Sequence, residues 1–107
     1  MAQLPIGAIQ ERDDYICTYC DKDGLESLDN WHDSTVDHFT PRKYGGTDDP
    51  ANLRTCCHYC NCLKGDQVFG TVEDCRAYIH QRRAELQITF EAVKKAVRAD
   101  TRPGAQI

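Results

Sequence analysis

The chain has 107 residues, seven of them cysteine, and a formal net charge of −4. This length fits one domain, residues 1–107, whose small core would gain from additional stapling. The first fifteen residues lack the basic and apolar regions of a secretory signal, and no later run is long enough to cross a bilayer. We therefore expect a cytoplasmic protein without a membrane segment, in a reducing compartment where paired cysteines bind metal more often than they form disulfides.

The charge is divided unevenly along the sequence. Residues 1–53 hold four Lys or Arg and eleven Asp or Glu, a net charge of −7, whereas residues 54–107 hold nine and six, a net charge of +3. An acidic total argues mildly against a nucleic-acid partner, but the second half could present a basic face. Binding through phosphate contacts alone would then be weak and would fade with salt.

The elements that precede the second half are expected to be short. Residues 15–16 could open a strand, and residues 25–33 predict an irregular or helical connector that covers the core with Leu25, Leu28 and Trp31. Residues 34–39 are typical of a strand, which Pro41 should end because proline has no amide hydrogen to donate. A loop over 40–50, a second strand over 52–55 and a short helix over about 57–68 follow.

A helical extension is predicted over 71–99. Thr71 is a good N-cap, and acidic residues follow it in the first turn. Apolar residues recur at helical spacing on one face, which we expect to cover the core: Val72, Cys75, Ile79, Leu86, Phe90, Val93 and Val97. The β-branched pair at 88–89 allows a break near 84–89, so either one long helix or two would fit. Basic residues beside this face leave room for a homodimer or for a partner protein.

Two Cys-x2-Cys units provide the strongest local pattern. The first pair is Cys17 and Cys20, and Cys57 and Cys60 repeat its spacing. Four thiolates are what a closed tetrahedral zinc site needs, so we predict one structural Zn²⁺ bound by these four residues. Cys56, His58 and Cys62 make the second pair ambiguous, and the repeated spacing decides for Cys57 and Cys60. The remaining cysteines are then free thiols.

A second group of residues predicts catalytic chemistry. The carboxylate of Asp37 and the amide oxygen of Asn61 could bind Mg²⁺ or Mn²⁺, which prefer oxygen ligands. His38 could take a proton from water near neutral pH. Adjacent residues on a regular strand point to opposite faces, so this site requires the strand to bulge or to end at His38. Lys64 lies one helical turn beyond Asn61 and could contact a phosphate.

In this order, these signals resemble those of the HNH endonucleases, and above all the zinc-containing branch with its ββα-metal core. The resemblance covers about residues 15–68 and rests on four segments: Cys17/Cys20, Asp37-His38-Phe-Thr-Pro41, Asn52-Leu53, and Cys57-His-Tyr-Cys60-Asn61-Cys-Leu-Lys64-Gly65. Cys62 stands where a basic residue is often found in the family.

The resemblance implies a role for each matched residue. His38 corresponds to the general base, Asn52 to the residue that ties the loop and helps to orient the histidine, and Asn61 to a ligand that shares the catalytic ion with Asp37. The expected fold is α+β, a small ββα-metal core with a four-cysteine zinc site and a C-terminal helical extension.

The function expected from this reading is metal-dependent hydrolysis of phosphodiester bonds in DNA, with one divalent ion stabilising the phosphate and the leaving group. Arg42, Lys43 and Lys64 are the candidates for contacts with substrate phosphates. The alternative is a catalytically silent, zinc-stabilised module that binds nucleic acid or protein.

Overall fold

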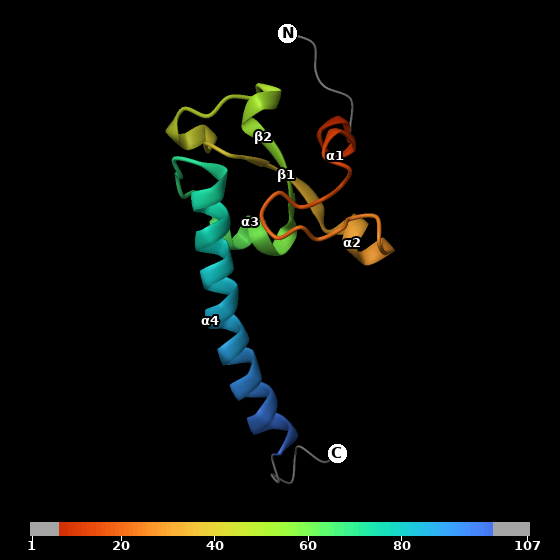
Figure 1. Ribbon diagram of the computed structural model, residues 1–107, viewed down its shortest axis with the longest axis vertical. Coiled ribbons are helices and arrows are strands. Elements are labelled where there is room, and N and C mark those ends of the chain that lie inside the picture. The colour runs from red at the N-terminus through yellow and green to blue at the C-terminus, as the bar shows by residue number, and fades with distance from the viewer. Residues whose placement is uncertain (1–6, 100–107) are drawn as a thin grey trace.

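A computed structural model describes residues 7–99 of the chain. Its elements are short up to residue 64 and end in one long helix (Figure 1). In chain order they are α1 (Ala8–Arg12), α2 (Leu28–His32), β1 (Ser34–His38), η1 (Arg42–Tyr44), η2 (Pro50–Asn52), β2 (Leu53–Cys57), α3 (His58–Lys64) and α4 (Val72–Arg98). The predicted α+β class is confirmed. Along residues 7–99 there is no helix with the length and apolar content needed to span a bilayer.

The two strands form an antiparallel sheet in which Ser34 pairs with Cys57 and His38 with Leu53. β1 ends at His38, because the following residues turn into the loop that Pro41 opens as the N-cap of η1. Gly46 closes this turn with its amide bonded to the Pro41 carbonyl, and a Cβ there would lie 1.7 Å from the Thr40 carbonyl oxygen. Only glycine fits so close an approach, so the loop holds the end of β1 in place.

α1 is an element that the sequence patterns did not indicate. Arg12 at its end donates to the carbonyls of Pro50 (2.9 Å) and Leu53 (2.7 Å). Asp13 accepts a hydrogen bond from the backbone amide of Thr55 at 3.1 Å. These contacts join the N-terminal segment to β2 through polar groups, which a search for apolar periodicity does not detect.

The core is small and rich in sulfur. It consists of Cys17, Tyr19, Cys56, Cys57, Cys60, Cys75 and Ile79. The connector expected to cover it does not do so, because Leu25, Leu28 and Trp31 are all exposed. α2 is instead held by polar contacts, with Ser27 as its N-cap. A core of this size supplies limited hydrophobic stabilisation, to which a bound metal would add.

α4 is one unbroken helix of 27 residues. Its first part packs on the core through Cys75 and Ile79, both completely buried. Arg76 anchors it by bonding to the Thr18 carbonyl and to both carboxylate oxygens of Asp21. The second part extends away from the other elements (Figure 1), so the expectation that the whole apolar face covers the core is wrong beyond Leu86.

Candidate active site and metal centre

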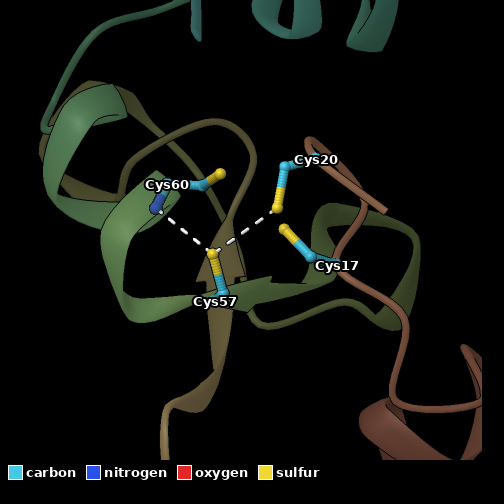
Figure 2. Close-up of side chains that lie close together, drawn as sticks. All are labelled: Cys17, Cys20, Cys57 and Cys60. Atoms are coloured by element: carbon cyan, nitrogen blue, oxygen red, sulfur yellow. Dashed lines mark hydrogen bonds between the residues drawn. The ribbon is translucent and has the colours of Figure 1, made fainter. Parts of the chain in front are cut away.

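The four predicted zinc ligands converge on one point. Cys17 and Cys20 come from the turn between the bridged residues Ile16 and Asp23, whereas Cys57 ends β2 and Cys60 lies in the first turn of α3. Their sulfur atoms all lie within 4.8 Å of one another (Figure 2), and those of Cys20 and Cys57 are 3.7 Å apart. Neither Cys56 nor Cys62 belongs to this cluster. The pair that the repeated spacing selected is therefore the one that lies in this cluster.

This cluster has the dimensions of a tetrahedral thiolate site. Four sulfurs at about 2.3 Å from a zinc ion would lie about 3.8 Å from one another. Hydrogen bonds among these thiols, first that with Cys20, lower the pKa of Cys17, whereas the bonds with Cys17 raise the pKa of Cys20 and Cys60, so it is the spacing of the sulfur atoms that suits a metal. The cluster is thus consistent with structural zinc.

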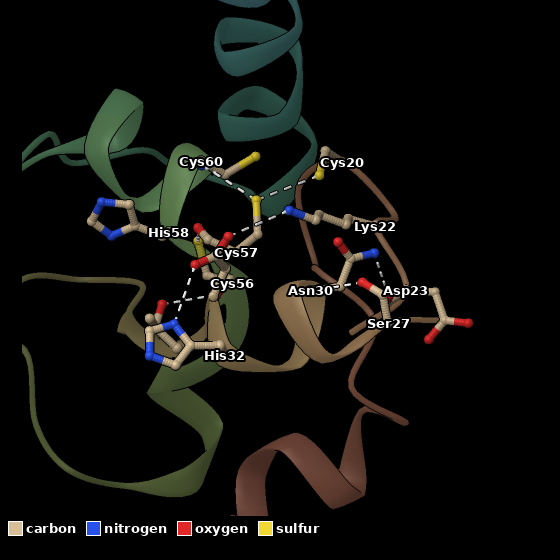
Figure 3. Close-up of polar contacts among 12 residues, drawn as sticks. Cys20, Lys22, Asp23, Ser27, Asn30, His32, Cys56, Cys57, His58 and Cys60 are labelled. Atoms are coloured by element: carbon tan, nitrogen blue, oxygen red, sulfur yellow. Dashed lines mark hydrogen bonds and ion pairs between the residues drawn. The ribbon is translucent and has the colours of Figure 1, made fainter. Parts of the chain in front are cut away.

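Polar contacts brace the cluster from several sides. The amides of Tyr19 and Cys60 point at the sulfurs of Cys17 and Cys57, each at 3.4 Å. Arg83 of α4 approaches the Cys60 sulfur at 3.8 Å. Around the first cysteine pair, Asn30 of α2 donates to the Asp23 carbonyl at 3.0 Å and Ser27 caps the same helix (Figure 3). The cluster therefore joins the N-terminal turn to the end of β2, to α3 and to α4.

Three of the four predicted catalytic residues meet at the other end of β1, whereas Asn52 lies outside the hollow that they line. Asp37, His38 and Asn61 line a single open hollow of about 320 Å³, together with Arg42 and Lys43 on its rim. We call this the His38 hollow. α3 starts directly after Cys57, so the cysteine cluster fixes the place of Asn61 relative to β1. Lys64 is not among the residues that line the hollow.

Of Asp37, His38 and Asn61, Asp37 is the least exposed, with 7% of its surface accessible. Its Oδ2 accepts a hydrogen bond of 2.7 Å from the Tyr19 hydroxyl and lies 3.2 Å from the Lys64 ammonium. Burial and the negative charge of Asp37 raise the pKa of Tyr19, so the phenol keeps the proton that it donates. Sequence reasoning missed Tyr19, because a tyrosine between two cysteines is not distinctive by itself.

Lys64 differs from its expected role. It is completely buried, and its ammonium also donates to the His38 carbonyl at 3.2 Å. A side chain in this place cannot reach a phosphate at the surface without breaking its pair with Asp37. Lys64 is therefore withdrawn as a candidate phosphate contact, and it supports the floor of the hollow instead.

His38 is partly exposed and has an acidic neighbour that sequence reasoning missed. Its Nε2 lies 2.8 Å from Asp48 Oδ1 and 3.2 Å from Arg42 Nε, and Arg42 Nη2 donates to the same Asp48 oxygen at 2.6 Å. Arg42 Nε is placed to donate to the same Nε2, so the tautomer of His38 decides which contact forms: a proton on Nε2 bonds it to Asp48, and a lone pair there accepts from Arg42. Hydrogen bonds from His38 and Arg42 lower the pKa of Asp48, which keeps it ionised.

Asn52 bridges the loop that follows β1. Its amide oxygen accepts from the Thr40 amide at 2.8 Å, and its amide nitrogen donates to the carbonyls of Thr40 (3.0 Å) and Thr47 (2.9 Å). The Asn52 carbonyl also accepts from the Phe39 amide at 2.8 Å. These are the contacts that a loop-tying residue needs, and they hold the backbone on either side of Pro41.

Comparison with known proteins agrees with this arrangement. The HNH endonuclease family model matches residues 17–67, from the first cysteine pair to just beyond α3. No curated protein and no solved structure gave a match. The chain therefore carries an HNH domain over residues 17–67, and its four-cysteine cluster is consistent with the zinc-binding type of this domain. The function of this domain lies in the class of nucleases and nucleic-acid-binding proteins.

Proposed function

We propose that this chain is a metal-dependent endonuclease that hydrolyses phosphodiester bonds in DNA. The observation that supports this most is the common lining of the His38 hollow by Asp37, His38 and Asn61. Asp37 and His38 come from the end of β1 and Asn61 from α3, and all three face the same open hollow. Together they supply a proton acceptor and oxygen ligands within reach of a bound phosphate.

The donor set suits a hard divalent cation such as Mg²⁺ or Mn²⁺. The amide nitrogen of Asn61 faces Thr35 Oγ1 at 3.4 Å, which leaves its amide oxygen as the atom available to an ion. The Asp37 carboxylate borders the same hollow and would be the charged ligand. When bound, the ion would supply stabilisation of the negative charge on the phosphate and on the leaving 3′ oxygen.

His38 would act as the general base. In the tautomer whose Nε2 proton is directed at Asp48, Nδ1 is the acceptor that can take a proton from water. The carboxylate also favours the positively charged imidazolium that forms when this proton arrives. Asp48 is thus proposed as a positioning residue, and Asn52 as the residue that keeps the loop carrying it closed on β1.

Arg42 and Lys43 are the proposed phosphate contacts. Arg42 is held by Asp48 but remains largely exposed, and Lys43 lies next to it on η1 with its ammonium 5.5 Å from the centre of the Tyr44 ring. Both border the hollow, so a DNA backbone that enters it would meet two positive charges. For the cysteine cluster we propose one structural Zn²⁺.

One observation favours a second candidate, a zinc-stabilised binding module without catalysis. Asp37 is buried and already paired with Lys64 and Tyr19, which are the contacts of a purely structural carboxylate. The two candidates differ in one assay. Zinc-loaded protein freed of other divalent ions should nick supercoiled plasmid when Mg²⁺ or Mn²⁺ is added, whereas a silent module would bind DNA and leave it intact.

A further inference from the structure

The outer half of α4 carries an apolar face without a neighbour in the described part of the chain. Every residue from Gln87 to Ala99 is exposed. Cys75 and Ile79 bury one side of the helix against the core, and the same side continues as Leu86, Phe90, Val93 and Val97, at steps of four, three and four. We call these four residues the distal stripe. Phe90, Val93 and Val97 are 54%, 55% and 52% exposed.

We propose that a second copy of this chain covers the distal stripe, with the two α4 helices packed side by side in antiparallel directions. Steps of four and three are the spacing at which two helices interlock along a seam. In an antiparallel pair centred between residues 91 and 92, Leu86 of one copy lies level with Val97 of the other. Phe90 then lies level with Val93. The stripe is therefore complementary to itself, with a larger side chain opposite a smaller one in each layer.

The charges beside the stripe favour this direction over a parallel one. Glu91 and Lys94 lie on the same flank, where they form an exposed pair within the helix at 3.1 Å. In the antiparallel arrangement, Glu91 of each copy also lies near Lys94 of the other. In a parallel pair, the flank that carries Lys94 would instead face the opposite flank of the second helix, with Thr89 and Ala96, so these charges would find no partner there. Electrostatics therefore distinguishes the two arrangements of the same apolar seam.

A groove at the base of the stripe provides room for the end of the second helix. It measures about 450 Å³ and lies between Tyr59 of α3 and residues Leu86 and Phe90 of α4. The Tyr59 ring is fixed beneath the Arg83 guanidinium, 4.3 Å away. In the proposed register this groove is level with Val97 of the second copy. The groove and the stripe would thus be covered together.

The size of this contact sets its expected strength. The stripe spans twelve residues, or about 18 Å of helix. An interface of this length belongs with the small ones that bury less than about 1,200 Å², which dissociate readily. We therefore expect a reversible dimer with a dissociation constant on the order of micromolar or weaker.

Sedimentation velocity of zinc-loaded protein under reducing conditions tests the proposal. Reducing conditions prevent crosslinks through the exposed Cys62 thiol. The wild type should shift from monomer to dimer as its concentration rises, and Phe90→Glu should remain monomeric. Ile88→Glu is the matched control, because Ile88 is 73% exposed and lies away from the stripe on the same helix. Circular dichroism should show equal helix content in all three proteins.

The register has its own test. Lys94→Glu should weaken the dimer, and Glu91→Lys combined with Lys94→Glu should restore it. A monomer at every concentration, or equal loss of the dimer in Phe90→Glu and Ile88→Glu, would overturn the proposal. A wild-type protein that stays monomeric and binds DNA through the distal stripe would overturn it as well. No substrate is present in the sedimentation experiments, so their outcome is independent of whether the protein cleaves DNA.

Discussion

The Lys64 ammonium lies 3.2 Å from Asp37 Oδ2, and both groups are buried beneath the His38 hollow. Two charges removed from water each lose several kcal/mol of hydration, which only a close partner and further hydrogen bonds offset. Tyr19 and the His38 carbonyl provide those bonds. This pair links α3 to β1 and holds the Asp37 carboxylate in one orientation at the edge of the hollow.

Loss of the Lys64 ammonium should therefore destabilise the fold. Lys64→Met leaves the Asp37 carboxylate buried without its partner, which should lower the free energy of unfolding by about 3–5 kcal/mol. Urea unfolding of zinc-loaded protein measures this change. Lys43→Met is the control, because Lys43 is exposed and its substitution should change stability by less than about 0.5 kcal/mol. Equal effects of the two substitutions would show that the buried pair contributes nothing.

The four-cysteine cluster includes one of two adjacent cysteines and excludes the other. Cys56 and Cys57 are both buried, but only the Cys57 sulfur belongs to the four-sulfur cluster. Cys57→Ser should abolish stoichiometric zinc and leave the chain largely unfolded, because structural zinc contributes directly to folding. Cys56→Ala should keep one zinc per chain. Elemental analysis of purified protein gives both answers, and full zinc content in Cys57→Ser would exclude the assigned ligands.

Asp48 should influence catalysis without binding the ion or the substrate. Asp48→Ala removes the carboxylate that faces His38 Nε2, so the imidazole loses a partner that holds its orientation. The rate of nicking should fall, but by less than the roughly 10²- to 10⁴-fold expected for loss of a general base. The Mn²⁺ concentration that gives half-maximal rate should stay unchanged.

Asp49→Asn is the control for Asp48→Ala. Asp49 lies in the same loop and accepts from the Ala51 amide at 2.8 Å, a bond that asparagine can keep. If Asp48→Ala cleaves as fast as Asp49→Asn, the contact with His38 has no catalytic role.

Asp13 should make stability depend on pH. Burial alone would raise its pKa, but hydrogen bonds from Arg12 and Thr55 outweigh it and hold the pKa below the usual 3.8. A lowered folded-state pKa means that ionised Asp13 stabilises the fold above pH 3.8, and that this contribution disappears as the pH falls through the lowered value. Asp13→Asn should cost about 1 kcal/mol near neutral pH, a figure reduced by solvent screening.

The pH dependence of this difference is the test. The gap in free energy of unfolding between wild type and Asp13→Asn should close as the pH falls below about 4. The two proteins are to be compared while both retain zinc, because loss of zinc in acid would unfold both. Asp14→Asn serves as control, since Asp14 makes no side-chain hydrogen bond in the described part of the chain. A gap that is constant with pH would mean that the charge of Asp13 is not involved.

Sequence patterns indicated those parts of the fold that depend on local chemistry. Pro41 predicted the end of β1, which the structure places at His38, and repeated spacing selected Cys57 over Cys56. Patterns could not show that Lys64 is buried, because lysine is almost always exposed unless a partner folds against it. Asp48 was missed because it lies ten residues from His38 in the sequence, and only the turn at Gly46 brings the two side chains together.

α4 shows the limit of periodicity. The apolar spacing identified one face from Val72 to Val97 but could not indicate where the core ends along it. The β-branched residues at 88–89 left open a break that the structure does not have, because their lower helix propensity amounts to only about 0.5 kcal/mol each. Such a cost is too small to interrupt a helix of 27 residues.

Plasmid nicking by His38→Ala is the most direct test of His38 as the general base. Zinc-loaded wild type, His38→Ala and His80→Ala would be assayed over a Mn²⁺ titration, with His80 as the exposed control on α4. Wild type and His80→Ala should nick DNA at similar rates. His38→Ala should be slower by roughly 10²-fold or more at every Mn²⁺ concentration, because an ion cannot replace the proton acceptor. Near-wild-type nicking by His38→Ala, or a wild type that does not nick DNA, would contradict catalysis with His38 as the general base.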